Sequence, residues 1–265
     1  MSDAPFVPPP GDHPGDRLGR LFLRAFSVMD VAEPLPSFDA GAPAAEVEAF
    51  LRSRGLALVG VREDGLVAGF AERDDLRDGR LSDHVRRFGP DDLVPSTASL
   101  SETIRSLDVN GRCFVSVLGR VGANVTFRDL EKPPVRMWLF GMITIFEMFV
   151  TGRIRDRLPG DAWVRHVSPA RLARARALQE ERRRRGRDAD LLECVQLADK
   201  AAVLVRAPGV APELDLGSRR QAEEAYQRIQ ALRNALAHTQ REIVSTDWQL
   251  VVRMADRVEQ IAALA

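Results

Sequence analysis

The residues from Arg233 to His238, near the C-terminus, are the group in this sequence best placed to act together on a ligand. They end a pattern that starts at Ser218, in which apolar residues recur at three- and four-residue steps and predict one amphipathic helix. Ser218 and Gln221 form a capping box at its start. Arg233 and His238 are roughly 140° apart around an ideal helix, so they converge on one ligand only if the last turn loosens or the arginine reaches round. Asn234 and His238 share one face of the helix.

This stretch resembles the Arg-x4–6-His motif of the HEPN domain, a helical bundle whose active members cleave RNA and in which a polar residue, here Asn234, usually follows the arginine. The resemblance implies metal-independent cleavage that leaves a 2′,3′-cyclic phosphate. His238 would act as general acid or base at the ribose 2′-hydroxyl or the leaving 5′-oxygen. Arg233 would stabilise charge on the phosphate, because its planar guanidinium suits that group, and Asn234 would orient one of the two. The resemblance also implies a homodimer whose two motifs face one cleft, single-stranded RNA as a partner, and no catalytic cofactor.

Other interpretations of these residues stay open. His238 could be a solvated cap, because the C-terminal end of a helix favours cations. Many HEPN bundles are non-catalytic, so this one could serve only as a dimerisation surface. The run Arg182–Arg185 could bind a phosphate backbone. A helix C-terminus favours cations in any case, so a solvated charged helix end is the alternative. The alternatives to a ribonuclease are therefore a non-catalytic regulatory module and, third, direct nucleic-acid binding.

The second half of the chain has the pattern of the helical bundle that the resemblance requires. Met137–Val150 is apolar nearly all round apart from Glu147, and it falls short of the ~20 residues that a bilayer span needs. We expect it to be the buried central helix and expect no membrane partner; an amphipathic membrane helix is the less favoured alternative. The predicted helices cover residues 136–157, 168–185, 190–205, 218–239 and 247–263.

A helix, a glycine cap and two strands occur twice in the first half, roughly 55–60 residues apart. Each copy is expected to end in a second helix, at Asp74-Asp75-Leu76 in the first copy and at Thr126–Leu130 in the second. The predicted parts of the first copy are a helix at 44–54, Gly55, a strand at 56–61, a turn at Asp64-Gly65 and a strand at 66–70. Those of the second copy are a helix at 101–110, Gly111 and strands at 113–118 and 121–125.

The repeat resembles a tandem pair of cystathionine-beta-synthase (CBS) domains, whose β-β-α units pack into a disc with clefts for adenine nucleotides such as ATP or AMP. Thr126 and Asp129 match the family's Thr/Ser-x-x-Asp signature, in which the carboxylate accepts hydrogen bonds from both ribose hydroxyls. The matching residues of the first repeat are Glu72 and Asp75. Because Glu72 replaces the hydroxyl and would repel a phosphate, we expect the second repeat to be the better nucleotide site. Asp129 could alternatively be a plain helix cap.

Composition limits the remaining possibilities. Basic and acidic residues both number 38, but residues 131–265 hold 23 and 18 of them, which permits an RNA partner. Cys113 and Cys194 lie in apolar runs and are expected to be buried thiols, and the four histidines show no zinc-type spacing, so no metal site is expected. Ala4–Gly15 lacks the hydrophobic region of a signal peptide, so we expect the cytoplasm. Arginine greatly outnumbers lysine, which suggests a GC-rich bacterial genome.

We therefore expect an α+β chain with a disordered tail at 1–20, CBS repeats at 21–80 and 81–135, and a HEPN-like helical bundle at 136–265. In this interpretation the CBS pair senses an adenine nucleotide and controls an endoribonuclease that uses Arg233 and His238 at a dimer interface. The alternative is a nucleotide-responsive regulatory or dimerisation module without catalysis.

Overall fold

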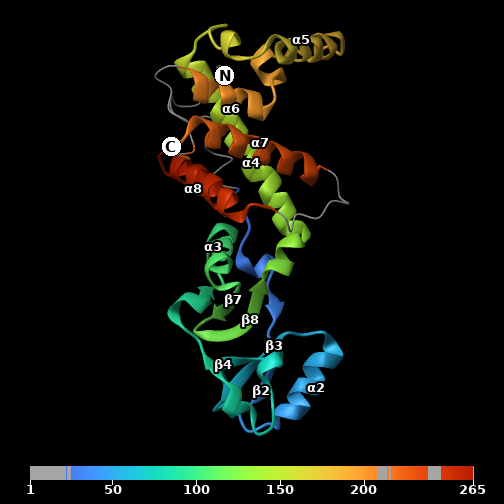
Figure 1. Ribbon diagram of the computed structural model, residues 1–265, viewed down its shortest axis with the longest axis vertical. Helices are drawn as coiled ribbons and strands as arrows, with labels where there is room; N and C mark the ends of the chain where they lie inside the picture. The colour runs from blue at the N-terminus through green and yellow to red at the C-terminus, as the bar shows by residue number, and fades with distance from the viewer. Residues whose placement is uncertain (1–21, 23–24, 208–213, 215, 238–245, 265) are drawn as a thin grey trace, which may run out of the picture. The chain divides into compact units, whose positions relative to one another are not determined.

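The computed structural model of the 265-residue chain describes residues 22, 25–207, 214, 216–237 and 246–264, with side chains as far as residue 260 (Figure 1). The tail predicted at 1–20 lies outside these residues. The chain forms two compact units, Phe26–Val135 and a second made mainly of Arg136–Ala265. The first unit combines sheets with helices, and the second is helical in its described part, so the architecture is α+β.

Two small sheets make up the N-terminal unit, with the strand orders β2-β3-β4-β5 and β1-β8-β7-β6. In each sheet a helix connects two parallel strands, and a hairpin adds a third strand. The first repeat contains β2 (Ser37–Asp39), α2 (Ala44–Arg54), β3 (Leu58–Glu63), β4 (Leu66–Glu72) and β5 (Arg86–Arg87). The second contains β6 (Leu93–Pro95), α3 (Leu100–Asn110), β7 (Arg112–Val117) and β8 (Arg120–Thr126), with β1 (Glu33–Pro34) at its edge.

The two hairpins repeat each other residue by residue, 54 positions apart. Leu58 pairs with Glu72 as Arg112 pairs with Thr126. Both hairpins turn through two residues with positive φ, and the first of these turns is the predicted Asp64-Gly65. The shared register places Glu72 and Thr126 at equivalent positions of the two sheets.

Two details of the predicted repeat are wrong. The order of elements is β-α-β-β instead of β-β-α, because the leading strands β2 and β6 have three residues each and are too short to show alternation. The helix expected to open at Asp74 is one 3-10 turn, Arg73–Asp75. Gly79 follows with a φ of +98°, which no helix includes. The helix expected at Thr126–Leu130 is likewise a 3-10 turn, Phe127–Glu131.

Aromatic side chains join the two repeats. The ring centroids of Phe70 and Phe88 each lie 4.8 Å from that of Phe114, and 5.9 Å from each other. Phe70 and Phe114 also belong to a buried cluster with Leu35 and Leu58. Because residues of both hairpins share this core, the repeats pack as one unit.

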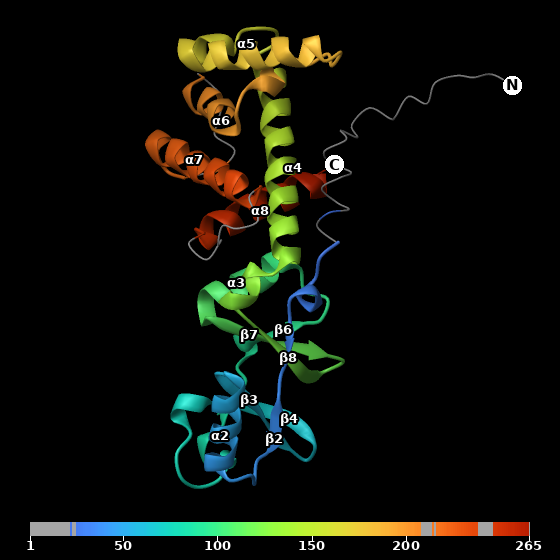
Figure 2. The same cartoon turned by 90° about the vertical axis from the view of Figure 1, so that its right-hand side faces the viewer.

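The described helices of the C-terminal unit are α4 (Pro133–Arg157), α5 (Pro169–Arg184), α6 (Leu197–Arg206), α7 (Arg219–Leu236) and α8 (Trp248–Leu264). Helices α5, α6, α7 and α8 lie at successive levels along α4 (Figures 1 and 2). The predicted capping box of α7 is confirmed, since the Ser218 hydroxyl accepts a hydrogen bond from the Gln221 amide. The single helix predicted at 190–205 is wrong in its first part, where a 3-10 turn (Leu191–Cys194) and the extended Val195 precede α6.

Helix α4 is longer than its predicted apolar run. It begins at Pro133, three residues before the predicted start at residue 136, because proline is tolerated at the first position of a helix. With 25 residues and a mean hydropathy of 1.4 in its most apolar window, α4 is long and apolar enough to cross a membrane by length and composition. The expectation that it falls short of a span is therefore wrong, although half of that window is buried, as in the core helix of a bundle.

Candidate functional site

Arg233 lies in the last turn of α7, which ends at Leu236 rather than at His238. The next residue of the motif, Asn234, is exposed. His238 lies outside the described residues. The structure therefore locates the arginine and the asparagine of the motif, and the approach of the histidine to them stays a prediction.

Glu147 of α4 faces the arginine of the motif. The Nη2 atom of Arg233 lies 3.6 Å from Oε2 of Glu147, and the Nζ atom of Lys200 on α6 lies 2.8 Å from Oε1. The side chain of Lys200 is 4% exposed and that of Glu147 is 16% exposed, whereas that of Arg233 is 40% exposed. One carboxylate thus serves two cations, and only the arginine reaches solvent.

A second contact fixes α7 against α6. The side-chain oxygen of Gln230, one turn before Arg233, accepts a hydrogen bond of 2.8 Å from the Ala198 amide at the start of α6. Its side-chain nitrogen donates to the Gln196 side chain at 2.9 Å. These bonds set the register of the two helices, so Arg233 is placed by helix packing as well as by its ion pair.

The arrangement can bind an anion at a defined place. The Nε atom of Arg233 is buried and has no hydrogen-bond partner among the described residues, while the rest of the guanidinium is shared between Glu147 and solvent. A guanidinium held on one side offers its remaining donors to a phosphate in a fixed geometry. The carboxylate of Glu147 opposes this, because it already neutralises part of the positive charge.

The sequence interpretation missed Glu147 and Lys200. Two signals were present: Glu147 is the only acidic residue in an apolar run, and Lys200 is one of the two lysines of the chain. A charge in an otherwise buried helix needs a partner, but the spacing of residues does not identify that partner.

In the first repeat, arginines bind the predicted nucleotide-site carboxylates. Arg86 of β5 donates to Glu72 at 2.9 Å and to Asp75 at 2.5 Å. Arg112 of the second repeat also donates to Glu72, at 2.7 Å, and its guanidinium lies 5.4 Å from the ring centre of Phe70. The structure therefore brings Glu72 and Asp75 together and pairs both with cations.

In the second repeat, Asp129 caps the turn that follows β8. Its Oδ2 atom accepts hydrogen bonds from the Thr126 amide at 2.8 Å and from the Thr126 hydroxyl at 3.0 Å. Its Oδ1 atom pairs with Lys132 at 2.9 Å, and Lys132 also pairs with Glu33. Burial opposes the charge on Lys132, but the bonds to Glu33 and Asp129 outweigh it and hold the pKa of the ammonium above its usual value. Lys132 thus covers one oxygen of Asp129, whose own side chain is only 10% exposed.

The two repeats place opposite charges at the same edge. Phe70 and Asn124 are 54 positions apart and occupy equivalent places in the two sheets. On the edge strands, Arg86 pairs with Phe70 and Glu33 pairs with Asn124. The first carboxylate site therefore pairs with a cation of the edge strand, Arg86, in addition to Arg112. The second has an acid there and draws its cation from Lys132.

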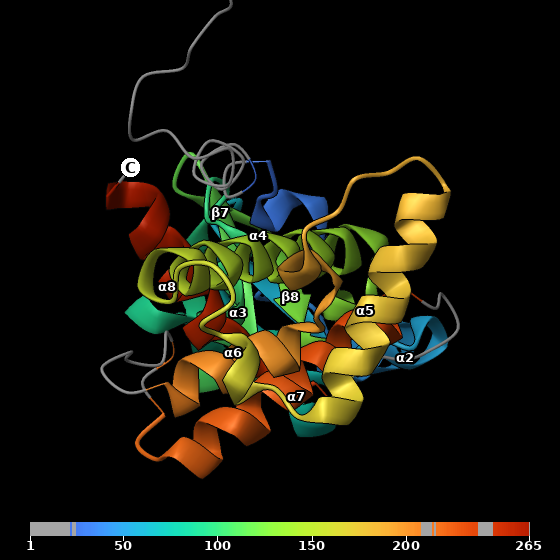
Figure 3. The same ribbon diagram turned by 90° about the horizontal axis from the view of Figure 1, so that it is seen from above.

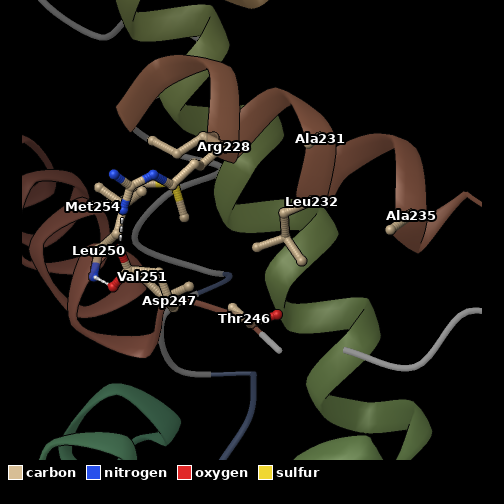
Figure 4. Close-up of a pocket in the computed structure, with 10 residues that line it drawn as sticks. Arg228, Ala231, Leu232, Ala235, Thr246, Asp247, Leu250, Val251 and Met254 are labelled. Carbon is tan, nitrogen blue, oxygen red and sulfur yellow. Dashed lines mark hydrogen bonds and ion pairs between the residues drawn. The ribbon is translucent and has the colours of Figure 1, made fainter. Parts of the chain in front are cut away.

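An apolar groove of about 290 Å³ lies between α7 and α8 (Figure 4). Leu232 and Ala235, on either side of Arg233 and Asn234 in sequence, line its α7 wall. An ion pair of 2.8 Å between Arg228 and Asp247 lies at its edge. The full lining is Arg228, Ile229, Ala231, Leu232, Ala235, Thr246, Asp247, Leu250, Val251 and Met254.

Among the described residues, no three or more His, Cys, Asp or Glu side chains lie together as a metal site. Cys113 and Cys194 are buried free thiols, as predicted. Burial raises the pKa of the Cys113 thiol to about 12, with a further contribution from the charge of Asp129.

No protein-family model matches the sequence, and no curated protein matches it. Solved CBS-domain structures are similar to the N-terminal half of the chain. The CBS domain of the bacterial CNNM/CorC family Mg2+ transporter is 16% identical with a TM-score of 0.37, and the match covers 47% of this chain and 86% of that one. The same domain in complex with ATP gives 16% identity and a TM-score of 0.36, over 44% and 92% of the two chains. A conserved CBS-domain protein from Thermoplasma acidophilum is 18% identical with a TM-score of 0.37, over 45% and 75%.

Proposed function

We propose that the protein is an adenine-nucleotide sensor coupled to a phosphate-binding effector, and that the effector is a metal-independent endoribonuclease of the HEPN type. The observation that carries the effector proposal is the placement of Arg233. It lies at the end of α7, with the carboxylate of Glu147 3.6 Å away, and its side chain is 40% exposed. A positioned guanidinium of this kind is what stabilises charge on a phosphate in a transition state.

His238 would complete this site as general acid and base. It would remove the proton from the ribose 2′-hydroxyl, whose oxygen then attacks the adjacent phosphorus, or return a proton to the leaving 5′-oxygen. The phosphate becomes a 2′,3′-cyclic diester and the 5′-hydroxyl leaves. Because each chain supplies only one motif histidine, two protomers would contribute one motif each to a shared cleft. Asn234 would orient either Arg233 or His238.

The sensor proposal is supported by the pairing of carboxylates with cations in the repeats. At Asp129, both ribose hydroxyls would replace Lys132 on Oδ1, which frees an ammonium for the nucleotide phosphates. Lys132 directly precedes Pro133, the first residue of α4, and α4 carries Glu147. Displacement of Lys132 by a ligand would therefore act at the start of the helix whose Glu147 faces Arg233.

A non-catalytic effector is the second candidate, and one contact favours it. Glu147 lies 3.6 Å from Arg233 and reduces the positive charge that a phosphate would meet. In that case the bundle would be a nucleotide-responsive dimerisation module whose Arg233 is structural.

Cleavage of labelled single-stranded RNA by the purified full-length protein, with and without ATP or AMP, separates the two candidates. For a nuclease we expect products ending in a cyclic phosphate, unaffected by EDTA, and a loss of about 10²–10⁴-fold in His238→Ala. His166→Ala is the matched control, since it removes another imidazole of the same unit, and it should cleave normally. Absence of cleavage under every ligand, or equal activity in wild type and His238→Ala, would leave the regulatory module.

A further inference from the structure

Positive charge is concentrated in one stretch of the helical unit. Residues 165–187 contain nine arginines and two acidic residues, which leaves 29 basic and 36 acidic residues in the rest of the chain. This stretch contains the whole of α5 and its two flanks. A chain with no net charge therefore carries one strongly basic segment on an acidic remainder.

Packing against the core does not explain the amino-acid composition of α5, because few of its side chains are buried. Ala175 is its one buried residue, and Leu178 is exposed. The helix lies across the C-terminal end of α4, and it forms one edge of the helical unit when seen from above (Figures 2 and 3). Most of its surface is therefore available to a partner.

Some of these arginines have acidic partners. Arg171 pairs with Asp199, and Arg185 pairs with Glu181. Glu180 lies 3.4 Å from both Arg183 and Arg184, which is a loose contact shared by two cations. The other five arginines of residues 165–187, all within the described part of the chain, form no ion pair there: Arg165, Arg174, Arg176, Arg182 and Arg187.

The helix dipole accounts for only part of this charge. Its attraction for cations is confined to the last turn, which contains Arg182, Arg183 and Arg184. Arg174 and Arg176 lie in the middle of α5, where the dipole contributes little. An excess of exposed arginine in mid-helix indicates a polyanionic partner.

We propose that α5 is a binding surface for the phosphate backbone of single-stranded RNA. The guanidinium groups would donate paired hydrogen bonds to successive phosphates along a helix of about 24 Å. Because α5 contains no aromatic residue, bases do not stack on it, and binding is independent of RNA sequence. The proposal rests on the proposed function in that RNA is also the substrate of the Arg233 motif. Helix α5 would bind the RNA while the motif cleaves it.

Fluorescence anisotropy with a labelled oligouridylate tests this surface in full-length protein carrying His238→Ala, which prevents cleavage during the measurement. The test variant adds Arg174→Gln and Arg176→Gln. The matched control adds Arg54→Gln and Arg120→Gln, which remove the same charge from exposed positions without ion pairs among the described residues. We expect the test variant to bind roughly tenfold more weakly, with a salt slope smaller by about 1.4, and the control to bind like its parent.

Equal affinity and salt slope in the test variant and its parent would overturn the proposal, as would equal losses in test and control variants. Binding of the parent to vesicles of anionic lipid but not to RNA would assign the surface to a membrane and overturn it too. The outcome is separable from the nuclease proposal. Charge-dependent RNA binding without cleavage by the wild type would retain the surface and reject the nuclease, whereas cleavage with no effect of Arg174 and Arg176 would do the reverse.

Discussion

The Nζ atom of Lys200 lies 2.8 Å from Oε1 of Glu147, inside the helical unit, where the lysine side chain is 4% exposed. The other oxygen of the same carboxylate faces Arg233 at 3.6 Å. Lys200 therefore fixes the carboxylate that faces Arg233. Any activity that depends on the position of Arg233 depends on this buried pair as well.

Removing the charge of Glu147 should destabilise the protein strongly. In Glu147→Gln the ammonium of Lys200 would remain buried without a counterion, and we expect a loss of about 3–5 kcal/mol in the free energy of unfolding. Denaturant titration of the full-length protein measures this loss. The control is Glu181→Gln, which removes an exposed pair with Arg185 and should cost at most about 1 kcal/mol.

Replacing both partners distinguishes a charge effect from a packing effect. Glu147→Leu combined with Lys200→Met should recover most of the stability lost in Glu147→Gln, because no buried charge is left unpaired. A double variant as unstable as the single one would show that Lys200 does not depend on Glu147 for its burial.

Substitution of Arg233 by lysine should separate structure from chemistry. Arg233→Lys keeps a positive charge for Glu147, so the melting temperature should change little. RNA cleavage should nevertheless fall by about 10²–10³-fold, because an ammonium lacks the planar fork that contacts a phosphate through two bonds. Full activity in this variant would mean that only the charge matters, and parallel losses of activity and stability would mean a purely structural arginine.

The nucleotide site can be tested at Asp129. Asp129→Ala should abolish the thermal stabilisation by ATP or AMP, because the charge-assisted hydrogen bonds to the ribose, about 1.5–3 kcal/mol, are lost. Asp75→Ala is the matched control in the first repeat and should matter less. Equal losses in the two variants would refute the asymmetry between the repeats.

Lys132 gives an independent test, because Asp129→Ala also removes the cap that Asp129 provides for the turn after Thr126. Lys132→Met leaves that cap in place and frees Oδ1 of Asp129. We expect adenosine, which has the ribose but no phosphate, to stabilise this variant more than the wild type in thermal-shift measurements. A smaller shift with adenosine would show that Lys132 assists binding of the nucleoside instead of competing with it.

Cys113 should resist alkylation in the folded protein. Its side chain is buried, and burial raises its pKa to about 12. Because each pH unit below the pKa reduces the thiolate tenfold, only about one thiol in ten thousand is ionised at pH 8, and the thiolate is the reactive form. Mass spectrometry after treatment with iodoacetamide should find Cys113 unmodified in native protein and alkylated in urea, whereas rapid native labelling would contradict its burial.

The sequence determined the parts of this protein that depend on neighbouring residues. The capping box of Ser218 and Gln221, the positive-φ turn at Asp64-Gly65 and the glycine cap at Gly55 are each set by residue types within a few positions. The equivalence of Glu72 and Thr126 follows from the same kind of information, because two copies of one local pattern fold alike. The three-residue strands and the continuation of α4 from Pro133 were mispredicted, since short or ambiguous patterns leave the choice to packing.

Only the tertiary structure decided which charges meet. Glu147 and Lys200 are 53 positions apart, and Glu33 and Lys132 are 99 positions apart. No periodicity links such residues; helix packing and sheet pairing bring them together, and burial then requires each ion to have a partner. The sequence motifs therefore identify Arg233 and Asp129 but not the residues that contact them. Glu147 is the counterion of the buried Lys200, and Lys132 is the counterion of the nearly buried Asp129.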